Sequence, residues 1–183
     1  MDFFDLLAPI YDSVFSNKED LCNLIDFPNG GFVLDIGGGT GRISGTQISG
    51  CRIFVVDRSR SMLKQTKNKV GLIPICANAE ALPFKSLAFQ RILVIDAFHH
   101  FQNHPLTLDE IMRVLSEKGK AFIKEPDIKR ILVKFVALIE KLLQMKSVFF
   151  STDEFRKMIG KLKCEYSIIE TKYYYCAIVE KTA

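Results

Sequence analysis

Several patterns that mark particular protein classes are missing from this 183-residue sequence. It has no tryptophan, and no pair of its cysteines has the CxxC spacing that is typical of zinc sites and redox motifs. The five cysteines are Cys22, Cys51, Cys76, Cys164 and Cys176. Most of them lie among apolar residues, which favours buried, reduced thiols over a disulfide framework. We therefore expect a cytoplasmic protein without a disulfide or a zinc site.

Long apolar runs are also missing. The most apolar stretch, residues 131–143, is interrupted by Lys134, Glu140 and Lys141, so it is too short and too charged to span a bilayer. The N-terminus has no basic region ahead of an apolar run. We therefore expect neither a transmembrane segment nor a secretory signal.

Neither sign of charge is concentrated in one block. The 25 lysines and arginines are spread along the chain with 21 acidic residues, and the formal net charge is +4. This mild excess leaves a nucleic-acid partner open but does not favour one. The composition, 48% hydrophobic and 25% charged, is ordinary for a globular protein.

The length suits one compact domain and leaves little room for a second. We find no internal repeat, low-complexity segment or linker. The sequence therefore predicts a single domain over residues 1–183. It divides into N-terminal lid helices over 1–30, a cofactor-binding core over 31–125, and C-terminal helices with a hairpin over 126–183.

Short apolar runs alternate with helical patterns through the middle of the chain. The runs cover residues 32–36, 52–56, 72–76, 91–95 and 120–124. Each has about five residues rich in branched side chains, as expected for strands buried on both faces. Helical patterns lie between most of them, which predicts a parallel sheet with helices on both faces.

The two ends of the chain have different patterns. Residues 2–27 predict one or two helices, and residues 128–145 predict an amphipathic helix. Residues 151–154 form a plausible capping box for a further helix. Residues 165–180 predict two strands, at least one of them antiparallel, with a turn near residues 171–172. The expected fold is α/β: a Rossmann-like, doubly wound, mostly parallel seven-stranded sheet with an antiparallel C-terminal strand.

A glycine-rich loop, residues 35–41 (DIGGGTG), follows the first predicted strand and leads into a helical pattern. Glycines there let the backbone turn tightly and approach a ligand closely. A dinucleotide GxGxxG pattern would need glycine at the position of Arg42. Asp35 suits a cofactor that carries an ammonium group, and Asp57, at the end of the next strand, suits ribose hydroxyls. These details favour S-adenosylmethionine (SAM) over a nicotinamide cofactor.

Four segments together resemble the class I SAM-dependent methyltransferases, particularly the small-molecule group that includes the ubiquinone/menaquinone biosynthesis enzymes. Residues 33–41 resemble the first motif of that family, 56–63 the second, 77–84 the third and 95–101 the fourth. Residues 110–120 resemble the segment that leads into the fifth strand. The resemblance covers about residues 5–125 and implies methyl transfer from SAM.

The resemblance also implies roles for the matching positions. Asp35 and the loop backbone would hold the methionine part of SAM, Asp57 the ribose, and Met62 the adenine. Asn78 replaces the usual acid beside the adenine amino group, and its carbonyl oxygen can still accept a hydrogen bond. The expected cofactor-binding residues are Tyr11 in the N-terminal lid, Asp35, Gly37, Gly38, Gly39, Gly41, Asp57, Arg58, Met62, Asn78, Ala79, Glu80, Asp96 and Ala97.

Three histidines follow the fourth predicted strand. His100 and His104 are four residues apart and could share a helix face, but Pro105 and the lack of a further ligand argue against a metal. His99 or His100 could take a proton from an acceptor hydroxyl, so both are candidate catalytic residues. The alternative for each is packing or a structural hydrogen bond.

The acceptor is less well determined than the cofactor. No Asn-Pro-Pro-Tyr-like signature of base-modifying methyltransferases follows the fourth strand, which favours a small-molecule acceptor. The alternatives are an RNA or protein methyltransferase, a non-catalytic SAM-binding partner subunit, and a nicotinamide-dependent oxidoreductase. The apolar face of the helix predicted over 128–145, with Phe149 and Phe150, would either contact an apolar acceptor or pack on the sheet. The sequence leaves the oligomeric state undetermined.

Overall fold

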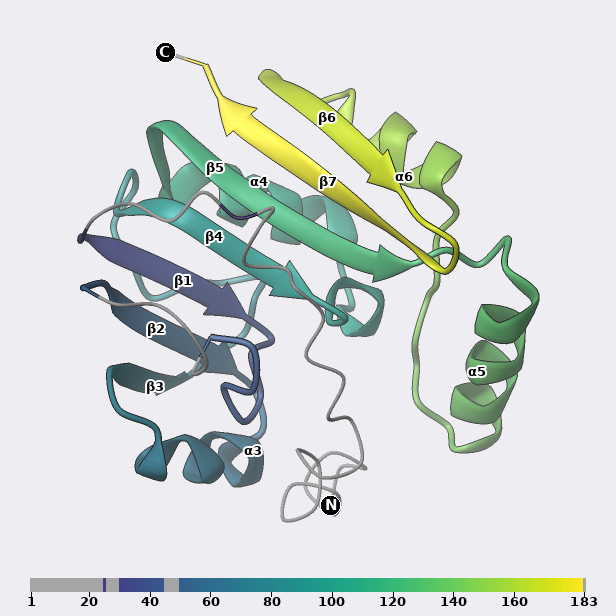
Figure 1. The fold of residues 1–183 in the computed structure, drawn as a ribbon, viewed down its shortest axis with the longest axis horizontal. Helices are drawn as coiled ribbons and strands as arrows, with labels where there is room; N and C mark the ends of the chain where they lie inside the picture. The colour runs from purple at the N-terminus through teal and green to yellow at the C-terminus, as the bar shows by residue number, and fades with distance from the viewer. Residues whose placement is uncertain (1–24, 26–29, 45–49, 183) are drawn as a thin grey trace.

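The computed structural model describes residues 25, 30–44 and 50–182. Within them a seven-stranded sheet has the order β3-β2-β1-β4-β5-β7-β6 (Figure 1). The helices expected over residues 2–27, including Tyr11, fall outside the described residues except for Ile25.

The strands bear out the predicted mixed sheet. They are β1 (Phe32–Ile36), β2 (Arg52–Asp57), β3 (Leu72–Cys76), β4 (Phe89–Ile95), β5 (Leu115–Pro126), β6 (Cys164–Glu170) and β7 (Tyr174–Lys181). Strands β1 to β5 pair in parallel, and β7 pairs antiparallel with both β5 and β6. Both predicted C-terminal strands are therefore antiparallel to their neighbours.

One strand corrects the expectation that the apolar runs are buried on both faces. Strand β3 lies at the edge of the sheet, where Ile73, Pro74 and Cys76 are exposed. Cys76 is therefore not a buried thiol, although Cys51 and Cys176 are buried and all four described cysteines are free. A run of apolar residues does not reveal its place in a sheet, and an edge strand has a neighbour on one side only.

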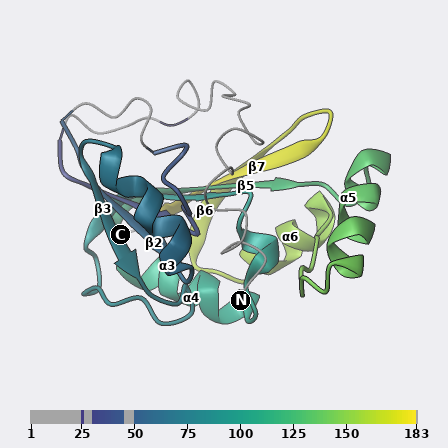
Figure 2. The same ribbon diagram turned by 90° about the horizontal axis from the view of Figure 1, so that it is seen from below.

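Helices contact both faces of the sheet. Helices α4 (His104–Val114) and α6 (Thr152–Ile159) lie on the same face (Figure 2). Their buried residues Ile111, Val114 and Phe155 join one core cluster with alternate residues of the central strands. Leu63 of the short helix α3 (Arg60–Lys64) joins a second cluster with the other alternate residues. This alternation follows from the two-residue period of strands.

The helix expected after the glycine loop falls partly outside the described residues: residues 42–44 form turns, and residues 45–49 lie outside the described part. Residues 77–88, between β3 and β4, contain no described helix, only an isolated bridge between Asn78 and Ala81. The remaining short helical segments are the 3-10 turns η2 (Gln65–Asn68) and η3 (Phe98–His100).

The amphipathic helix predicted over 128–145 is α5 (Ile131–Leu142), which lies beyond the end of the sheet (Figure 1). Its apolar face does not pack on the sheet: Ile131 is 71% exposed and Leu142 is 75% exposed, while Val133 is buried. The two ends of the segment that contains α5 lie side by side. The backbone N–H of Ile128 at one end donates to the carbonyl of Phe150 at the other (3.3 Å).

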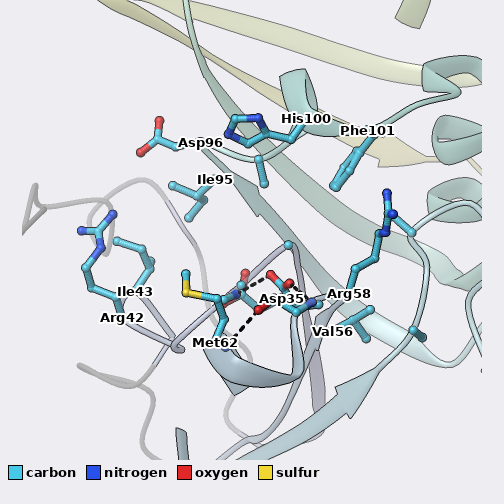
Figure 3. A pocket seen from close by; sticks show the side chains of 18 residues that line it. Asp35, Arg42, Ile43, Val56, Arg58, Met62, Ile95, Asp96, His100 and Phe101 are labelled. Atoms are coloured by element: carbon cyan, nitrogen blue, oxygen red, sulfur yellow. Dashed lines mark hydrogen bonds between the residues drawn. The ribbon is translucent and has the colours of Figure 1, made fainter. Parts of the chain in front are cut away.

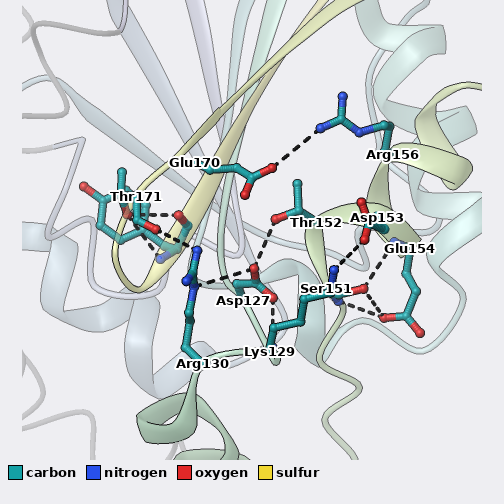
Figure 4. Close-up of polar contacts among 11 residues, drawn as sticks. Asp127, Lys129, Arg130, Ser151, Thr152, Asp153, Glu154, Arg156, Glu170 and Thr171 are labelled. Atoms are coloured by element: carbon teal, nitrogen blue, oxygen red, sulfur yellow. Dashed lines mark hydrogen bonds and ion pairs between the residues drawn. The ribbon is translucent and has the colours of Figure 1, made fainter.

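Polar contacts fix the base of this segment (Figure 4). The predicted capping box is present: Ser151 accepts from the N–H of Glu154, and Glu154 accepts from the N–H of Ser151. The buried carboxylate of Asp127 accepts from Thr152 (3.2 Å) and from the N–H of Lys129 (2.9 Å). A serine N-cap such as Ser151 stabilises a helix by about 1 kcal/mol. The start of α6 is thus tied to the end of β5.

Candidate functional site

The strand order reverses between β1 and β4, because β2 and β3 lie on one side of β1 while β5 and β7 follow β4 on the other. Ligands of open α/β sheets bind beyond the carboxyl ends of the strands at such a point. A cavity lies there (Figure 3). The sequence-predicted residues that line it are Asp35, Gly37, Gly38, Gly39, Asp57, Arg58, Met62, Ala79, Asp96, Ala97 and His100.

The glycine loop forms the floor of the cavity in a conformation that favours glycine. The φ angles of Gly37, Gly39 and Gly41 are +70°, +55° and +68°. The N–H of Gly37 donates to the carbonyl of Val56 (2.8 Å), so the loop bends over the end of β2. A Cβ atom on Gly37 would lie 2.6 Å from the Cβ of Ala97, which leaves no room for a side chain.

Asp35 lies beneath this loop, where its side chain is almost fully buried at 2% exposure. Within the described chain its Oδ2 atom has no hydrogen-bond partner. Burial raises the pKa of this carboxyl group to about 6, and the negative charge of Asp57 adds to the effect. A buried carboxylate in this state is stabilised by a bound cation.

Asp57 is held rigidly at the end of β2. Its Oδ2 accepts from the N–H of Gly39 (3.0 Å), and its Oδ1 accepts from the N–H of Ser59 (2.8 Å). A carboxylate oxygen has two lone pairs, so each oxygen can accept a further hydrogen bond from a ligand. Ser59 also caps α3 by accepting from the N–H of Met62, which places that buried side chain against the cavity.

Three of the predicted cofactor-binding residues that the structure describes do not line the cavity: Gly41, Asn78 and Glu80. The exposed Asn78 accepts from the N–H of Glu80 (3.3 Å). Glu80 in turn accepts from the N–H groups of Gln102 (2.8 Å) and Asn103 (2.7 Å). It therefore joins the segment after β3 to the start of α4.

The wall at the end of β4 contains Asp96, Ala97 and His100. Asp96 has φ +52°, a conformation uncommon outside glycine, and burial raises its pKa. Burial also lowers the pKa of His100 to about 3, with a further contribution from the neighbouring His99. His100 Nδ1 lies 2.9 Å from the hydroxyl of Ser147.

His99 points elsewhere and does not line the cavity. Its Nδ1 lies 2.5 Å from Oε2 of Glu125, and both side chains are buried. Burial alone would lower the pKa of His99, but the charge and hydrogen bond of Glu125, together with the charges of Glu140 and Asp96, outweigh it and raise that pKa. His104 begins α4 whereas His100 ends η3, so these two histidines do not share a helix as the sequence suggested.

Sequence reasoning missed several residues of this region. The cavity residues that were not predicted are Arg42, Ile43, Val56, Ser59, Ala77, Ile95 and Phe101. All are within two residues of a predicted one in sequence, so motif proximity was the available signal. Arg42 and Arg58 lie on opposite sides of the cavity (Figure 3). Glu125, which holds His99, follows β4 by 30 residues in sequence and carried no signal.

Comparison with known proteins identifies the family. A family described as "Methyltransferase domain" matches residues 34–123, which include the cavity-forming ends of β1, β2 and β4. The chain is 27% identical over 146 residues to the ubiquinone/menaquinone biosynthesis C-methyltransferase UbiE of Geotalea uraniireducens, covering 68% of this chain and 61% of that protein. Residues 34–123 form a methyltransferase domain of the class I SAM-dependent type.

Two further comparisons show how much of the chain is similar to known proteins. An uncharacterized protein of Methanocaldococcus jannaschii is 33% identical over 126 residues, covering 64% of this methyltransferase chain and 48% of that protein. A Haloferax volcanii protein solved in complex with the Trm112 methyltransferase activator superposes with a TM-score of 0.84 at 16% identity, covering 100% and 99% of the two chains. The latter shows the shared fold. The chain spans about half the length of the curated relatives it matches.

The residues of the cavity fit SAM, which is the cofactor of this methyltransferase class. The unpartnered Oδ2 of Asp35 suits an ammonium group, and the glycine floor leaves space that a Cβ atom would fill. The lone pairs of Asp57 suit hydroxyl donors.

None of the helices in the described part of the chain has the length and apolar character of a membrane span.

Proposed function

We propose that this methyltransferase moves the methyl group of SAM to a small-molecule acceptor. The observation that carries the proposal is the pair of carboxylates around the glycine floor: Asp35 buried beneath it and Asp57 fixed beside it. The absence of an Asn-Pro-Pro-Tyr-like segment after β4 supports a small molecule over a nucleic-acid base. In its place stand residues 96–99, Asp-Ala-Phe-His.

In this proposal each part of SAM meets a different part of the cavity. Asp35 pairs with the ammonium group while the backbone of the glycine loop holds the rest of the methionine part. Asp57 accepts from the ribose hydroxyls, and Met62 and Ala79 contact the adenine. Asp96 and Ala97 line the cofactor at the end of β4. The lid role of Tyr11 stays a prediction.

SAM supplies a methyl group already activated by a positively charged sulfur, so the chain mainly has to position the acceptor and exclude water. His100 and Phe101 lie on the cavity wall, where they would help to position the acceptor. Because its pKa is lowered to about 3, His100 is a weak base but a neutral hydrogen-bond acceptor near pH 7. We therefore propose that His100 orients the acceptor, while His99 supports the β4 end through Glu125.

Titration of the purified protein with SAM, S-adenosylhomocysteine and NADH tests the cofactor assignment directly. Binding of the first two in the micromolar range, and none of NADH, is expected. An assay of S-adenosylhomocysteine release against a panel of phenols, thiols and amines then tests the acceptor class. Binding of NADH alone would overturn the proposal.

A partner-dependent activity is the second candidate function. It is favoured by one observation: the Haloferax volcanii protein, similar over its full length, was solved with an activator of methyltransferases. In that case SAM binds, but no small acceptor is methylated by the chain alone. Turnover only on an RNA or protein acceptor, or only with an added partner chain, would establish this alternative.

Replacing Asp57 by alanine is expected to weaken SAM binding by about 1–3 kcal/mol, which is roughly 5- to 150-fold in Kd. The substitution removes two hydrogen-bond acceptors for the ribose and releases the N–H of Gly39 from its partner. Calorimetry of SAM binding measures the effect. The exposed Asp109 in α4 provides the control, since Asp109→Ala removes a carboxylate outside the cavity. Equal Kd values for the two variants would refute the ribose assignment.

The raised pKa of Asp35 predicts a pH dependence of SAM binding. As the pH falls through about 6 the carboxylate is protonated and loses its pairing with the ammonium group. Below that pH, Kd should rise about tenfold per pH unit. Calorimetric Kd values between about pH 5 and pH 7.5 measure it, and Asp35→Asn should bind weakly with a flat profile. A profile that is the same in wild type and Asp35→Asn would contradict the assignment.

The free protein should show the opposite trend for stability. Because the pKa of Asp35 is raised from 3.8 to about 6, the folded chain holds a proton that the unfolded chain has released between these values. Its contribution to the free energy of unfolding therefore falls as the pH rises through this interval. Above pH 6, bound SAM should offset this loss in the free energy of unfolding.

Replacing His100 by alanine is expected to lower turnover by about 10- to 100-fold while the Kd of SAM stays within about twofold. The reason is that His100 would contact the acceptor and not the cofactor. S-adenosylhomocysteine release with the best acceptor measures turnover, and calorimetry measures Kd. Gln102→Ala, at an exposed position two residues away, is the control. A large loss of SAM affinity in His100→Ala would move this residue to the cofactor side.

A further inference from the structure

Three side chains with metal-ligating atoms meet beside the cavity, although they come from two distant segments. His99 and His100 follow β4, and Glu140 lies 40 residues later in α5. One ligand atom of each lies within 4.8 Å of the others. The sequence argued against a metal at His100 and His104, because of Pro105 and the lack of a further ligand. This cluster contains His99 in place of His104, and Glu140 is its third member.

Glu140 shows that this cluster is electrostatically incomplete. Its Oε2 atom is buried, and among the described residues it has no hydrogen-bond partner. Leaving a carboxylate oxygen buried without a donor or cation is unfavourable. One carboxylate oxygen of Glu140 lies within 4.8 Å of a ring nitrogen of each imidazole, and the orientation of both rings is fixed by other contacts. A bound cation would satisfy it.

Both histidines have the supporting contacts that metal-ligating histidines usually have. Glu125 holds Nδ1 of His99 at 2.5 Å, and the hydroxyl of Ser147 lies 2.9 Å from Nδ1 of His100. The ring of His99 also stacks on Phe149, with ring centroids 4.4 Å apart. A partner on one ring nitrogen fixes the tautomer and turns the other nitrogen toward an ion. Nε2 would therefore be the ligating atom of each ring.

We propose that His99, His100 and Glu140 bind one divalent transition-metal ion of the zinc type. Two imidazoles and one carboxylate are a ligand set typical of catalytic zinc sites, which keep a further position open. Ligand atoms about 2 Å from one ion lie at most about 4 Å apart, so small rotations of the side chains are enough to close the cluster.

The open position would face the cavity, because His100 lines the cavity wall. One carboxylate and two neutral imidazoles leave a net positive charge on a divalent ion. Such an ion would bind a hydroxyl or thiol of an acceptor and favour loss of its proton to solvent water. The resulting oxyanion or thiolate would attack the methyl carbon of SAM as the bond from that carbon to sulfur breaks, and S-adenosylhomocysteine would leave. The acceptor class would then be phenols, alcohols or thiols, with His100 acting through the ion. This last step rests on the proposed methyl transfer, whereas binding of the ion does not.

Titration of chelator-treated protein with Zn²⁺ by calorimetry, and with Co²⁺ by visible absorption, tests the site. We expect one ion per chain, bound in the micromolar range or more tightly. Glu140→Gln keeps the size of the side chain and should weaken binding by about 100-fold, and Ser147→Ala should weaken it by about tenfold. Glu165→Gln, at an exposed position of β6, should bind like the wild type. Thermal unfolding of each variant checks that it is folded.

The outcomes separate this inference from the proposed function. Absence of a bound ion, or an unchanged Kd in folded Glu140→Gln, would overturn the metal site. Thiolate-to-cobalt charge-transfer bands would assign the ion to cysteines and also overturn it. SAM affinity, measured separately, should be the same in wild type and Glu140→Gln. If the ion binds as expected but SAM does not, the metal site stands and the methyl-transfer proposal fails alone.

Discussion

Gly37→Ala is expected to abolish measurable SAM binding, with a Kd raised at least about 100-fold. Two effects combine at this position. The φ angle of +70° is strained for alanine, and the new Cβ would lie 2.6 Å from the Cβ of Ala97. Ala97 is buried on the cavity wall and cannot rotate away, so the floor and the wall must move apart. The part of the cavity that would hold the methionine moiety is then distorted.

Gly71→Ala is the matched control for this variant. Gly71 has φ +84°, but a Cβ there would meet nothing within 4 Å. Both substitutions carry the cost of a positive φ angle, about 1–2 kcal/mol of stability. Only Gly37→Ala adds the steric conflict at the cavity. Calorimetry with SAM measures binding and chemical denaturation measures stability. A Gly37→Ala protein that binds SAM as tightly as Gly71→Ala would contradict the placement of the cofactor on the glycine floor.

Glu125→Ala is expected to lower the free energy of unfolding by about 3–5 kcal/mol, a large fraction of the stability of a typical domain. The carboxylate of Glu125 accepts from the buried N–H groups of Ala97 (2.9 Å), Phe98 (2.7 Å) and His99 (3.3 Å), and it pairs with the His99 ring. Alanine would leave these donors buried without a partner.

Urea denaturation of wild type and variant measures the loss, with the slope of the transition checked for two-state behaviour. Glu117→Ala is the control, because Glu117 is exposed and its contact with Lys181, at 4.0 Å, is long. That change should cost less than about 1 kcal/mol. A loss in Glu125→Ala no greater than in Glu117→Ala would mean that the buried donors find other partners.

The strands and the glycine floor could be predicted because their signals are local. Five apolar runs marked β1 to β5, and the carboxylates of Asp35 and Asp57 lie at positions fixed by the strand ends next to them. The cavity follows from these parts, since parallel strands bring their carboxyl ends to one edge. The parallel strands could therefore be recognised without long-range information, although their order in the sheet could not.

Contacts between distant segments could not be predicted in the same way. Glu125 and Glu140 look like ordinary acidic residues in the sequence, and only the fold brings them to His99. The exposure of β3 depends on its position at the sheet edge, and composition does not encode strand order. The apolar face of α5 has the period of a packed helix, but periodicity alone does not say what the face contacts.

The hydrogen bond that joins Ile128 to Phe150 at the base of the α5 segment has an evolutionary consequence. An excursion whose two ends meet can change length or sequence without altering the register of β5 or β7, much as surface loops tolerate insertions. The glycine floor follows β1, so changes in this excursion do not alter it. Selection could therefore vary this excursion among related proteins, and with it the neighbours of His99 and His100, while cofactor binding stays constant.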